Sequence, residues 1–489
     1  MACDPKASHL AASRIIPVIL SGLVGYGSYA FTKPFCIDYL IDPPRKLATL
    51  RPRKGVGIGL LIGFYLLLLL MVIVYVRLIS TVFLTPGYIP RGPQWSNASN
   101  NGANGSHEED RRSGSKHERP TRFLEKGECL PHPSIPTTSN NVEKEPYPFN
   151  ADGLEAFYMK DVFVCKEDGR PPWCSKCCQY KSDRAHHCSE VDRCVRKMDH
   201  FCPWVGGVIS ESSFKFFIQF LFYGLLFTIF NVVVMSRFVA ELRLQFGTIN
   251  VHWLLVLVVS GFFGLFLFGM LLSSLQLALI NSSTIESLDR RTKVWTLAVL
   301  ISRPNDLYRR YQGRNLPFPI VSYPSSTHAG SSNHGESSQA PQRREFAILT
   351  TKPGENPFEL GSPLSNLKEV MGYNLLDWFI PLRHSPCASH ENQESAFRLG
   401  PTVQRLRREA GLLEPSTSRP KNRYSTPAHP PVSRRKRKKN KSRDFIPASR
   451  LGSGTSPAHR ISKNKHKKSN DSKHTRRLEH RAETRRSPP

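Results

Sequence analysis

The sequence predicts an all-α polytopic membrane protein: a four-helix transmembrane bundle with a small cysteine-rich domain between the second and third spans. Three observations support this fold class. The apolar residues gather in four runs, while the rest of the 489-residue chain is largely polar. Helices of about twenty residues cross the ~30 Å hydrocarbon layer of a bilayer, and most of the runs reach that length. Between the second and third runs, cysteines and histidines occur at the spacing of metal ligands.

The four apolar runs are the expected spans. Val56–Val76, Phe216–Met235 and Trp253–Ile280 are long enough to cross a membrane. Ile15–Phe31 is shorter and contains Pro17 and several glycines, so it is a marginal fourth span. A secretory signal peptide is the alternative for this first run. No small-residue cleavage pattern clearly follows it and a second span comes soon after, so we expect a transmembrane helix.

The orientation of the spans follows from chemistry more than from charge. Basic residues are frequent in the loop Thr32–Lys54, but others lie beside the span ends on the opposite side. Thiols persist best in the reducing cytosol, so we place the cysteine-rich segment and the C-terminal tail there. We expect a multi-pass protein of an endomembrane or the plasma membrane. Asn97 and Asn104 begin glycosylation acceptor sequences, which stay bare in this orientation.

Composition divides the chain into six parts. These are spans one and two (1–84), a linker with a disordered insertion (85–146), the cysteine-rich domain (147–213), spans three and four (214–280), a C-terminal segment (281–389) and a disordered basic tail (390–489). The insertion, about residues 94–141, is rich in Asn, Ser, Gly and charge. Within the C-terminal segment, the apolar stretch Val370–Leu382 is expected to dock on the bundle or lie in the membrane interface.

The tail holds most of the chain's positive charge. From Pro401 to the end there are 26 Lys and Arg against 6 Asp and Glu, a net of +20 out of the chain's +29. Such a tail can be solvated, attract anionic lipids or bind nucleic acid. Nuclear import does not suit a polytopic protein. We therefore expect a solvated tail or contact with anionic lipids, and no nucleic acid partner.

The cysteine-rich segment has the spacing of a zinc site. Between residues 174 and 204 lie six of the chain's eleven cysteines and three histidines. A Cys-x2-Cys pair followed by a histidine and a cysteine is typical of structural zinc, which gives stability to a segment too small to bury a core. The expected ligands are Cys174, Cys177, His187 and Cys194. Buried thiols without metal are the alternative, and Cys178 or His186 could replace a ligand.

A second group of residues supplies the parts of an activated thiol. Cys202 follows Asp199 and His200 closely. A free thiol is only a few per cent ionised near neutral pH, so a nucleophilic cysteine needs a base or a lowered pKa. His200 is the nearest candidate base, and Asp199 can fix its tautomer and stabilise the imidazolium. In the alternative interpretation, His200 and Cys202 are ligands of a second zinc ion.

These motifs resemble the DHHC-type protein S-palmitoyltransferases. The segment from Cys174 to about Phe216 is similar to the family's cysteine-rich domain, with Asp-His-Phe-Cys in place of Asp-His-His-Cys. Residues 85–87 (Thr-Pro-Gly) are similar to the family's Asp-Pro-Gly, and residues 283–286 (Ser-Thr-Ile-Glu) to its Thr-Thr-x-Glu. Residues 356–372 resemble its C-terminal segment. The resemblance extends over the spans and motifs, which make up most of the chain outside the insertion and tail. The Asp-His-Phe-Cys variant and the long basic tail indicate a divergent, fungal-like branch of the family.

The resemblance implies a protein-cysteine S-palmitoyltransferase. Cys202 would take the acyl group from palmitoyl-CoA, or another long-chain acyl-CoA, and pass it to a membrane-proximal cysteine of a substrate protein. His200 would be the general base and Asp199 its orienting partner. The acyl chain would lie in a cavity between the spans, and coenzyme A would meet basic residues at the cytosolic membrane surface.

The chain departs from the family pattern at a second zinc site. Family members typically bind two zinc ions, and the second set would fall at Cys188, Val191, Phe201 and Val208. Three of these four residues are apolar, which indicates exchange of a metal site for a small hydrophobic contact. We therefore predict one structural zinc ion per chain and a buried free thiol at Cys188. Gly206 and Gly207 also differ from the family, which usually has asparagines there.

Two other classes of function are alternatives to an acyltransferase. The first alternative is a catalytically inactive membrane adaptor on the same scaffold, whose zinc segment and tail recruit partners. The second is a membrane-bound ligase of the RING type, which requires two interleaved metal sites, whereas this chain has ligands for one. Because the candidate base His200 and nucleophile Cys202 are both present, an active acyltransferase is the favoured interpretation.

Overall fold

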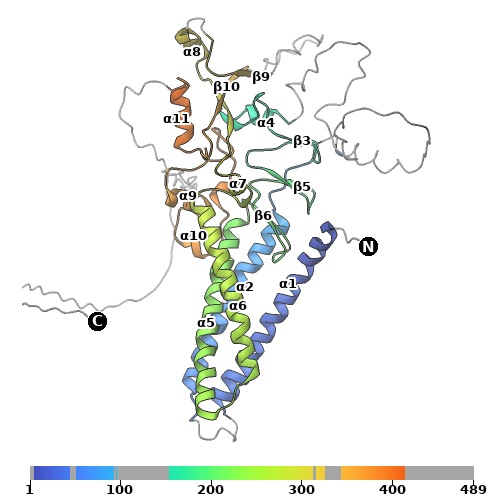
Figure 1. The fold of residues 1–489 in the computed structure, drawn as a ribbon, viewed down its shortest axis with the longest axis vertical. Coiled ribbons are helices and arrows are strands. Elements are labelled where there is room, and N and C mark those ends of the chain that lie inside the picture. Colours follow the sequence, from blue (N-terminus) through green and yellow to red (C-terminus); the bar gives the residue numbers. More distant parts are fainter. Residues whose placement is uncertain are drawn as a thin grey trace, which may run out of the picture. The chain divides into compact units, whose positions relative to one another are not determined.

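The computed structural model describes residues 5–43, 51–92, 95, 153–311, 315–324 and 343–413. Most of the expected insertion, both glycosylation sequences and the basic tail beyond residue 413 lie outside the described residues. The described residues form two parts. One consists of long apolar helices, and the other is built from hairpins, a sheet and short helices (Figure 1).

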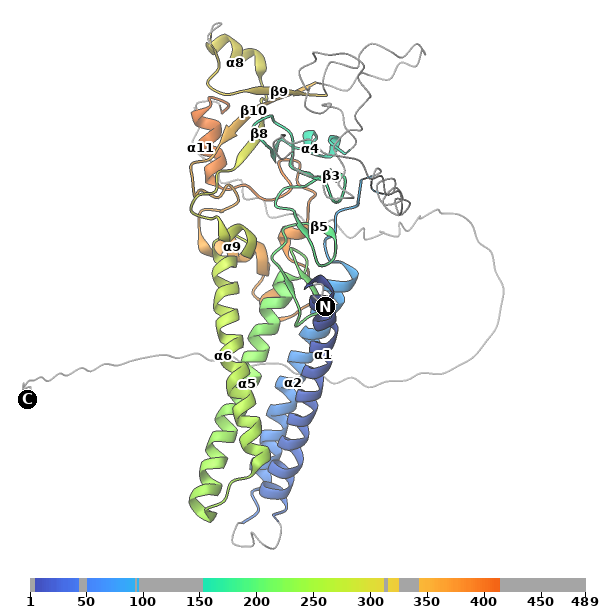
Figure 2. The same ribbon diagram turned by 45° about the vertical axis from the view of Figure 1, so that its right-hand side comes forward.

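The apolar runs form four long helical segments that lie side by side (Figures 1 and 2). They are α1 (Pro5–Ala30) with its π-helical continuation η1 (Phe31–Ile41), α2 (Lys54–Leu84), α5 (Phe214–Phe246) and α6 (Val251–Leu279). Each is long and apolar enough to cross a membrane, which confirms the predicted spans, including the marginal first one. α2 and α5 are longer than the apolar runs from which they were predicted, because the apolar run marks only the part of each helix that suits the hydrocarbon layer.

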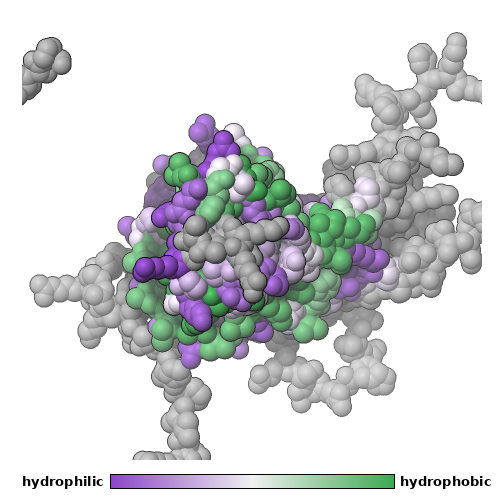
Figure 3. Space-filling view, turned by 90° about the horizontal axis from the view of Figure 1, so that it is seen from below, coloured by the Kyte–Doolittle hydropathy of each residue, from purple (hydrophilic) through white to green (hydrophobic). Residues whose placement is uncertain are grey.

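The end of the bundle away from the cysteine-rich segment is closed by aromatic packing and one buried carboxylate. Glu241 of α5 accepts from Arg53 at 2.6 Å and from the Tyr39 hydroxyl at 2.9 Å, which ties η1 and the start of α2 to α5. Figure 3 looks onto this end, where hydrophilic residues lie among the hydrophobic ones. The Glu241 carboxylate therefore finds its partners within the protein.

The cysteine-rich segment folds as three small antiparallel hairpins. They pair β2 (Trp173–Cys174) with β3 (Gln179–Tyr180), β4 (His186–Cys188) with β5 (Arg193–Val195), and β6 (His200–Cys202) with β7 (Gly207–Ile209). The chain leaving α2 crosses them, with an isolated bridge between Tyr88 and Val195. Strands this short bury little surface, so other interactions must hold the hairpins together.

A four-stranded antiparallel sheet, which was not predicted from the sequence, adjoins the hairpins. Its order is β1 (Val162–Val164), β8 (Thr296–Leu300), β10 (Arg344–Thr350) and β9 (Ile320–Tyr323). The helices packed with it are α4 (Glu155–Tyr158), α8 (Pro304–Tyr311) and α11 (Pro401–Glu409). Val403 and Leu406 of α11 are buried in the same core as Val299. The expected start of a disordered tail at residue 390 therefore falls inside the folded part and is corrected.

The C-terminal segment packs on α5. It contains α7 (Thr284–Leu288), α9 (Pro363–Met371), α10 (Leu376–Phe379) and the 3-10 turn η4 (Pro386–Ala388). Lys215, Gln219 and Tyr223 lie four residues apart on one face of α5 and donate to backbone carbonyls between Asp377 and Arg383. Of the two locations considered for this apolar stretch, the structure shows docking on the bundle.

Candidate active site and metal centre

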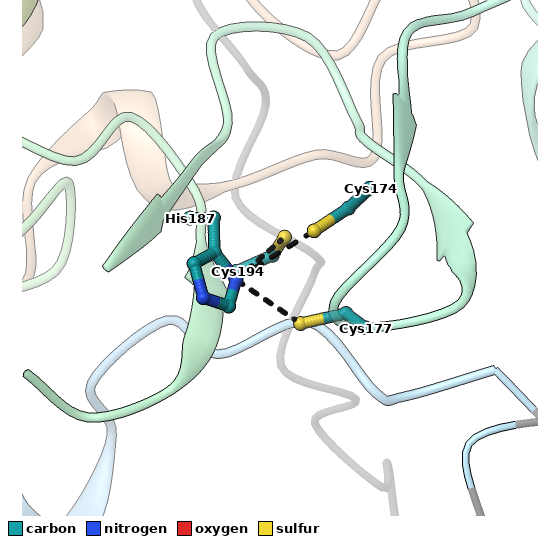
Figure 4. Close-up of side chains that lie close together, drawn as sticks. All are labelled: Cys174, Cys177, His187 and Cys194. Carbon is teal, nitrogen blue, oxygen red and sulfur yellow. Dashed lines mark hydrogen bonds between the residues drawn. The ribbon is translucent and has the colours of Figure 1, made fainter. Parts of the chain in front are cut away.

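The hairpins bring the four expected metal ligands together (Figure 4). Cys174 ends β2, Cys177 lies in the following turn, and His187 of β4 pairs with Cys194 of β5. Their ligand atoms all lie within 4.8 Å of one another. His187 Nδ1 is 3.4 Å from the sulfur of Cys177, 3.6 Å from that of Cys174 and 4.0 Å from that of Cys194. Ligands at about 2.0 Å (N) and 2.3 Å (S) around tetrahedral zinc are separated by about 3.6 Å, so the group fits zinc.

Neighbouring residues hold this group in place. The backbone N–H of Ile89 donates to the Cys194 carbonyl, and that of Gly92 to the Cys177 carbonyl, both at 2.9 Å. His187 Nε2 lies 3.4 Å from Asp192 Oδ1, so a carboxylate is close to the ring nitrogen that faces away from the three sulfurs. Among the described residues, neither Cys178 nor His186 belongs to the group.

The four positions of the family's second zinc set share one hydrophobic cluster. Its members are Cys188, Val195, Met198 and Val208, with Tyr88, Val191, Phe201 and Ile285 packed against them. Phe201 pairs with Val208 across β6 and β7. Cys188 is a buried free cysteine whose thiol donates to Glu190 Oε2 at 3.1 Å. Apolar contact therefore joins the hairpins at the place where a second metal would join them.

Strand β6 carries the expected base and nucleophile on the same side. His200 and Cys202 are its first and last residues, so their side chains point the same way from the strand. His200 Nδ1 donates to Asp199 Oδ2 at 2.7 Å, so Nε2 is the ring nitrogen left to exchange a proton with Cys202. Burial works to lower the pKa of His200, but the hydrogen bonds with Asp199 and Cys202 outweigh it and raise the pKa to about 9. The three side chains have the arrangement of a base-activated thiol.

Thr284, the first residue of α7, holds Asp199 in this position. Its backbone N–H and its hydroxyl donate to Oδ1 and Oδ2 of Asp199, each at 2.8 Å. Thr284 follows Ser283, which forms a capping box with Glu286 and so fixes the start of the helix. No sequence pattern by itself predicts this role of Thr284; the one indication is the resemblance of residues 283–286 to a family motif.

A buried ion pair fastens α7 to the cysteine-rich segment. Arg184 donates to both carboxylate oxygens of Glu286, at 2.8 and 2.6 Å, and to the side chain and carbonyl of Asn281. The two charged side chains are only 1% and 3% exposed. Burial works to raise the pKa of Glu286, but Arg184 outweighs it and lowers the pKa to about 2. Arg184 thus supports Asp199 through Glu286 and Thr284.

We expect Arg184→Met to destabilise the protein by about 3–5 kcal/mol, because Glu286 is left charged and buried without its partner. The measurement is chemical unfolding of the purified protein. The double variant Arg184→Met/Glu286→Leu should recover much of the loss, and Arg303→Met, in the exposed pair with Asp306, should change stability little. Wild-type stability in Arg184→Met would show that this pair does not fasten the two segments.

A cavity of about 660 Å³ begins beside Cys202 and continues between all four spans. His200, Cys202 and Trp204 lie on its wall, and most of the remaining lining residues are apolar side chains of the helices. Trp204 packs on Phe266 of α6, with ring centroids 5.4 Å apart. A mostly apolar cavity with a few polar groups at one end suits an apolar chain whose reactive group meets Cys202.

Two glycines allow the spanning helices to approach the β6–β7 turn. Gly206 has a φ of +75°, and a Cβ there would lie 3.2 Å from the carbonyl oxygen of Ser13 in α1. A Cβ on Gly207 would lie 2.5 Å from Val82 Cγ1 of α2. Larger side chains at these two positions do not fit this packing, so the departure from the family's asparagines has a structural reason here.

Comparison with known proteins gives one consistent result. Residues 167–291 match the family model described as DHHC palmitoyltransferase. Palmitoyltransferase pfa5 of Aspergillus fumigatus is 47% identical over 441 residues, which cover 87% of this chain and 96% of that protein. Palmitoyltransferase pfa5 of Emericella nidulans is 43% identical over 446 residues, 84% of this chain and 88% of that protein. Palmitoyltransferase PFA5 of Saccharomyces cerevisiae is 24% identical over 374 residues, 75% of this chain and 79% of that protein.

Proposed function

The chain belongs to the DHHC palmitoyltransferase family, and from that premise we propose that Cys202 is its acyl-accepting nucleophile, His200 the base and Asp199 the residue that orients His200. The protein is a multi-pass membrane S-palmitoyltransferase. The observation that supports the residue roles best is the hydrogen-bonded series from Thr284 through Asp199 to His200, with His200 and Cys202 together on the wall of the apolar cavity.

The first half of the reaction loads the enzyme. His200 Nε2 accepts the proton of the Cys202 thiol, and the sulfur attacks the thioester carbonyl of palmitoyl-CoA. The bond from that carbonyl to the sulfur of coenzyme A breaks, and the leaving thiolate takes the proton from His200. Asp199 stabilises the transient imidazolium through its bond to Nδ1. The palmitoyl chain occupies the cavity between the spans.

The second half of the reaction transfers the acyl group from Cys202 to a substrate protein. A cysteine thiol of a substrate protein gives its proton to His200 and attacks the acyl-enzyme carbonyl, and Cys202 leaves as the thiol. Thioester replaces thioester in both halves, so no other energy source is needed. Because the acyl chain stays beside the bundle, the substrate cysteine must lie near the membrane. This geometry favours substrate proteins with membrane-proximal cysteines.

The same proposal fixes the sidedness of the protein. Cys202 and the Cys3His group are on one end of the bundle, and thiols at both need a reducing compartment. We therefore place this end in the cytosol, where acyl-CoA is also available, on an endomembrane or the plasma membrane. The residues from Pro401 on have a net charge of +20, which suits anionic lipids, and we assign them no role in nucleic acid binding.

Zinc in this proposal is structural. Cys174, Cys177, His187 and Cys194 would hold it, and the bound ion would fix the hairpins that precede β6. The second family site has no equivalent donor set, because Val191, Phe201 and Val208 pack against Cys188 instead. One zinc ion per chain follows from this arrangement.

We expect elemental analysis of the purified protein to give one zinc per chain. Phe201→His alone should leave that number at one, because a single donor does not make a site. The triple variant Val191→Cys/Phe201→His/Val208→Cys restores four donors with Cys188 and should raise the number to two. Two zinc ions in the wild-type protein would contradict the proposed loss of the second site.

The test of the activity is release of free coenzyme A from palmitoyl-CoA by the purified full-length protein, together with an acyl label that hydroxylamine removes. We expect both. An inactive membrane adaptor would release no coenzyme A while its zinc content and fold remained intact, and that result would overturn the enzymatic proposal.

A further inference from the structure

A buried carboxylate just before α5 has one oxygen to which no described residue donates a hydrogen bond. Glu211 is only 4% exposed. Its Oε1 accepts from His390 Nε2 at 2.8 Å, whereas its Oε2 has no hydrogen-bond partner among the described residues. A buried carboxylate oxygen without a donor is unfavourable. This oxygen therefore requires a donor that the described part of the chain does not supply.

His390 fixes the other oxygen of this carboxylate. Its Nδ1 lies 2.9 Å from the Ala396 carbonyl oxygen and its Nε2 faces Glu211, so both ring nitrogens face acceptors. A histidine donates from both nitrogens only as the imidazolium. Burial works to lower the pKa of His390, but the bond with Glu211 outweighs burial and raises the pKa. The two residues thus form an ion pair between the C-terminal segment and the residues that precede α5.

Glu211 and Asp199 line the same small cavity, together with Lys197. Its volume of about 10 Å³ is close to what one water molecule needs, and such a water also needs two to four polar partners. The two carboxylates are acceptors. The Lys197 ammonium has three hydrogens and donates to Asn281 Oδ1 at 3.1 Å and to Cys387 Sγ at 3.7 Å, which leaves one for a water. The cavity therefore has the size and the polar groups of a water site.

Asp199 has one acceptor position left for such a water. Its Oδ2 accepts from His200 Nδ1 at 2.7 Å and from the Thr284 hydroxyl at 2.8 Å. Its Oδ1 accepts from the Thr284 backbone N–H at 2.8 Å. Each carboxylate oxygen has two lone pairs, so Oδ1 can accept from a second donor. A water that donates one hydrogen to Asp199 Oδ1 and the other to Glu211 Oε2 satisfies both oxygens.

We propose that Glu211 is a positioning residue for His200 and that it acts through one water molecule bound between Glu211 and Asp199. This inference rests on the proposed roles of His200 and Cys202. Thr284 holds the Asp199 carboxylate from α7, and the water holds it from the residues that precede α5. Both contacts keep the carboxylate against Nδ1 of His200, where it stabilises the imidazolium that forms when the base takes the thiol proton.

The test measures acyl-enzyme formation from palmitoyl-CoA as a function of pH in the wild type, Glu211→Met and Glu211→Gln. Glu211→Met keeps an unbranched side chain of similar size but removes the oxygens that bind the water. We expect its maximum rate to fall about tenfold, the effect of one lost buried hydrogen bond. The midpoint of its pH profile should move to lower pH, because a less restrained Asp199 favours the imidazolium of His200 less. Glu211→Gln keeps a polar group on the water and should recover most of the rate.

The KM for palmitoyl-CoA should not change in either variant, because Glu211 does not line the cavity between the spans. Glu369→Met is the matched control. Glu369 is also 4% exposed and also fastens the C-terminal segment, through Arg398 at 3.2 Å and Tyr373 at 2.7 Å, but it does not line the small cavity. We expect this variant to keep the midpoint of the wild type.

A wild-type midpoint or a wild-type maximum rate in Glu211→Met would overturn the inference. An equal shift of the midpoint in Glu369→Met would also overturn it, because the effect would then come from a loosened C-terminal segment.

A second measurement needs no variant that could fail to fold. A structure of the wild-type protein that resolves water molecules should show one within hydrogen-bond distance of both Glu211 Oε2 and Asp199 Oδ1, and its absence would contradict the proposal. Failure of the proposed function is distinguishable, because the wild type would then form no acyl-enzyme while this water remained.

Discussion

Cys202→Ser is expected to abolish the acyl-enzyme. The serine hydroxyl has the position of the thiol but not its acidity, and His200 cannot generate a comparable nucleophile from it. The variant should keep its fold and its zinc, because the Cys202 sulfur is not among the metal-binding group. The measurement is incorporation of labelled palmitate from palmitoyl-CoA into the purified protein, with protein substrate acylation followed on the same samples.

The control for this prediction is another buried cysteine. Cys165 is a free thiol that packs with residues of the sheet and does not line the cavity. Cys165→Ala should keep wild-type labelling. Undiminished labelling of Cys202→Ser would show that a different residue carries the acyl group.

His200→Ala is expected to slow acyl-enzyme formation by about 10²–10⁴-fold, the usual contribution of a positioned general base. The pH dependence gives an independent readout. As the proposed base, His200 acts in its neutral form, and its pKa is raised to about 9. The wild-type rate should therefore rise with pH from the neutral range, reach half of its maximum near pH 9 and level off above that. His200→Ala should lose this rise.

Asp199→Asn separates orientation from basicity. This substitution replaces the carboxylate that raises the pKa of His200 by a neutral amide. The midpoint of the pH profile should therefore move to lower pH. The maximum rate should also fall, because an amide NH2 facing Nδ1 favours the wrong tautomer. A profile in which Asp199→Asn keeps the wild-type midpoint would contradict the proposed role of this pair.

Much of the fold and of the site could be predicted from the sequence. Hydropathy alone identifies the four spans. In a bilayer the backbone polar groups must hydrogen-bond within the helix, so each span is a continuous helix that appears in the sequence as one apolar run. The four candidate metal ligands could be predicted from their spacing in the sequence. Cys174 and Cys177 are only three residues apart, so their side chains must lie close together. Adjacency in sequence also brought His200 and Cys202 together, because residues two apart share one side of a strand.

The remainder depends on contacts between distant parts of the chain. Val162 pairs with Val299 in the sheet, and strands of three to seven residues give little periodicity to detect. Arg184 reaches Glu286 across 102 residues, and Thr284 reaches Asp199 across 85. Such partners are fixed by the folded backbone and not by local spacing.

The most direct test of the central claim is a single-turnover reaction with labelled palmitoyl-CoA, followed by location of the acyl thioester by peptide mass analysis. If Cys202 and His200 act as proposed, the label lies on Cys202 in the wild type, forms at least about a hundredfold more slowly in His200→Ala, and is absent from Cys202→Ser at equal zinc content. A label on another residue, or an unchanged rate in His200→Ala, would contradict the claim.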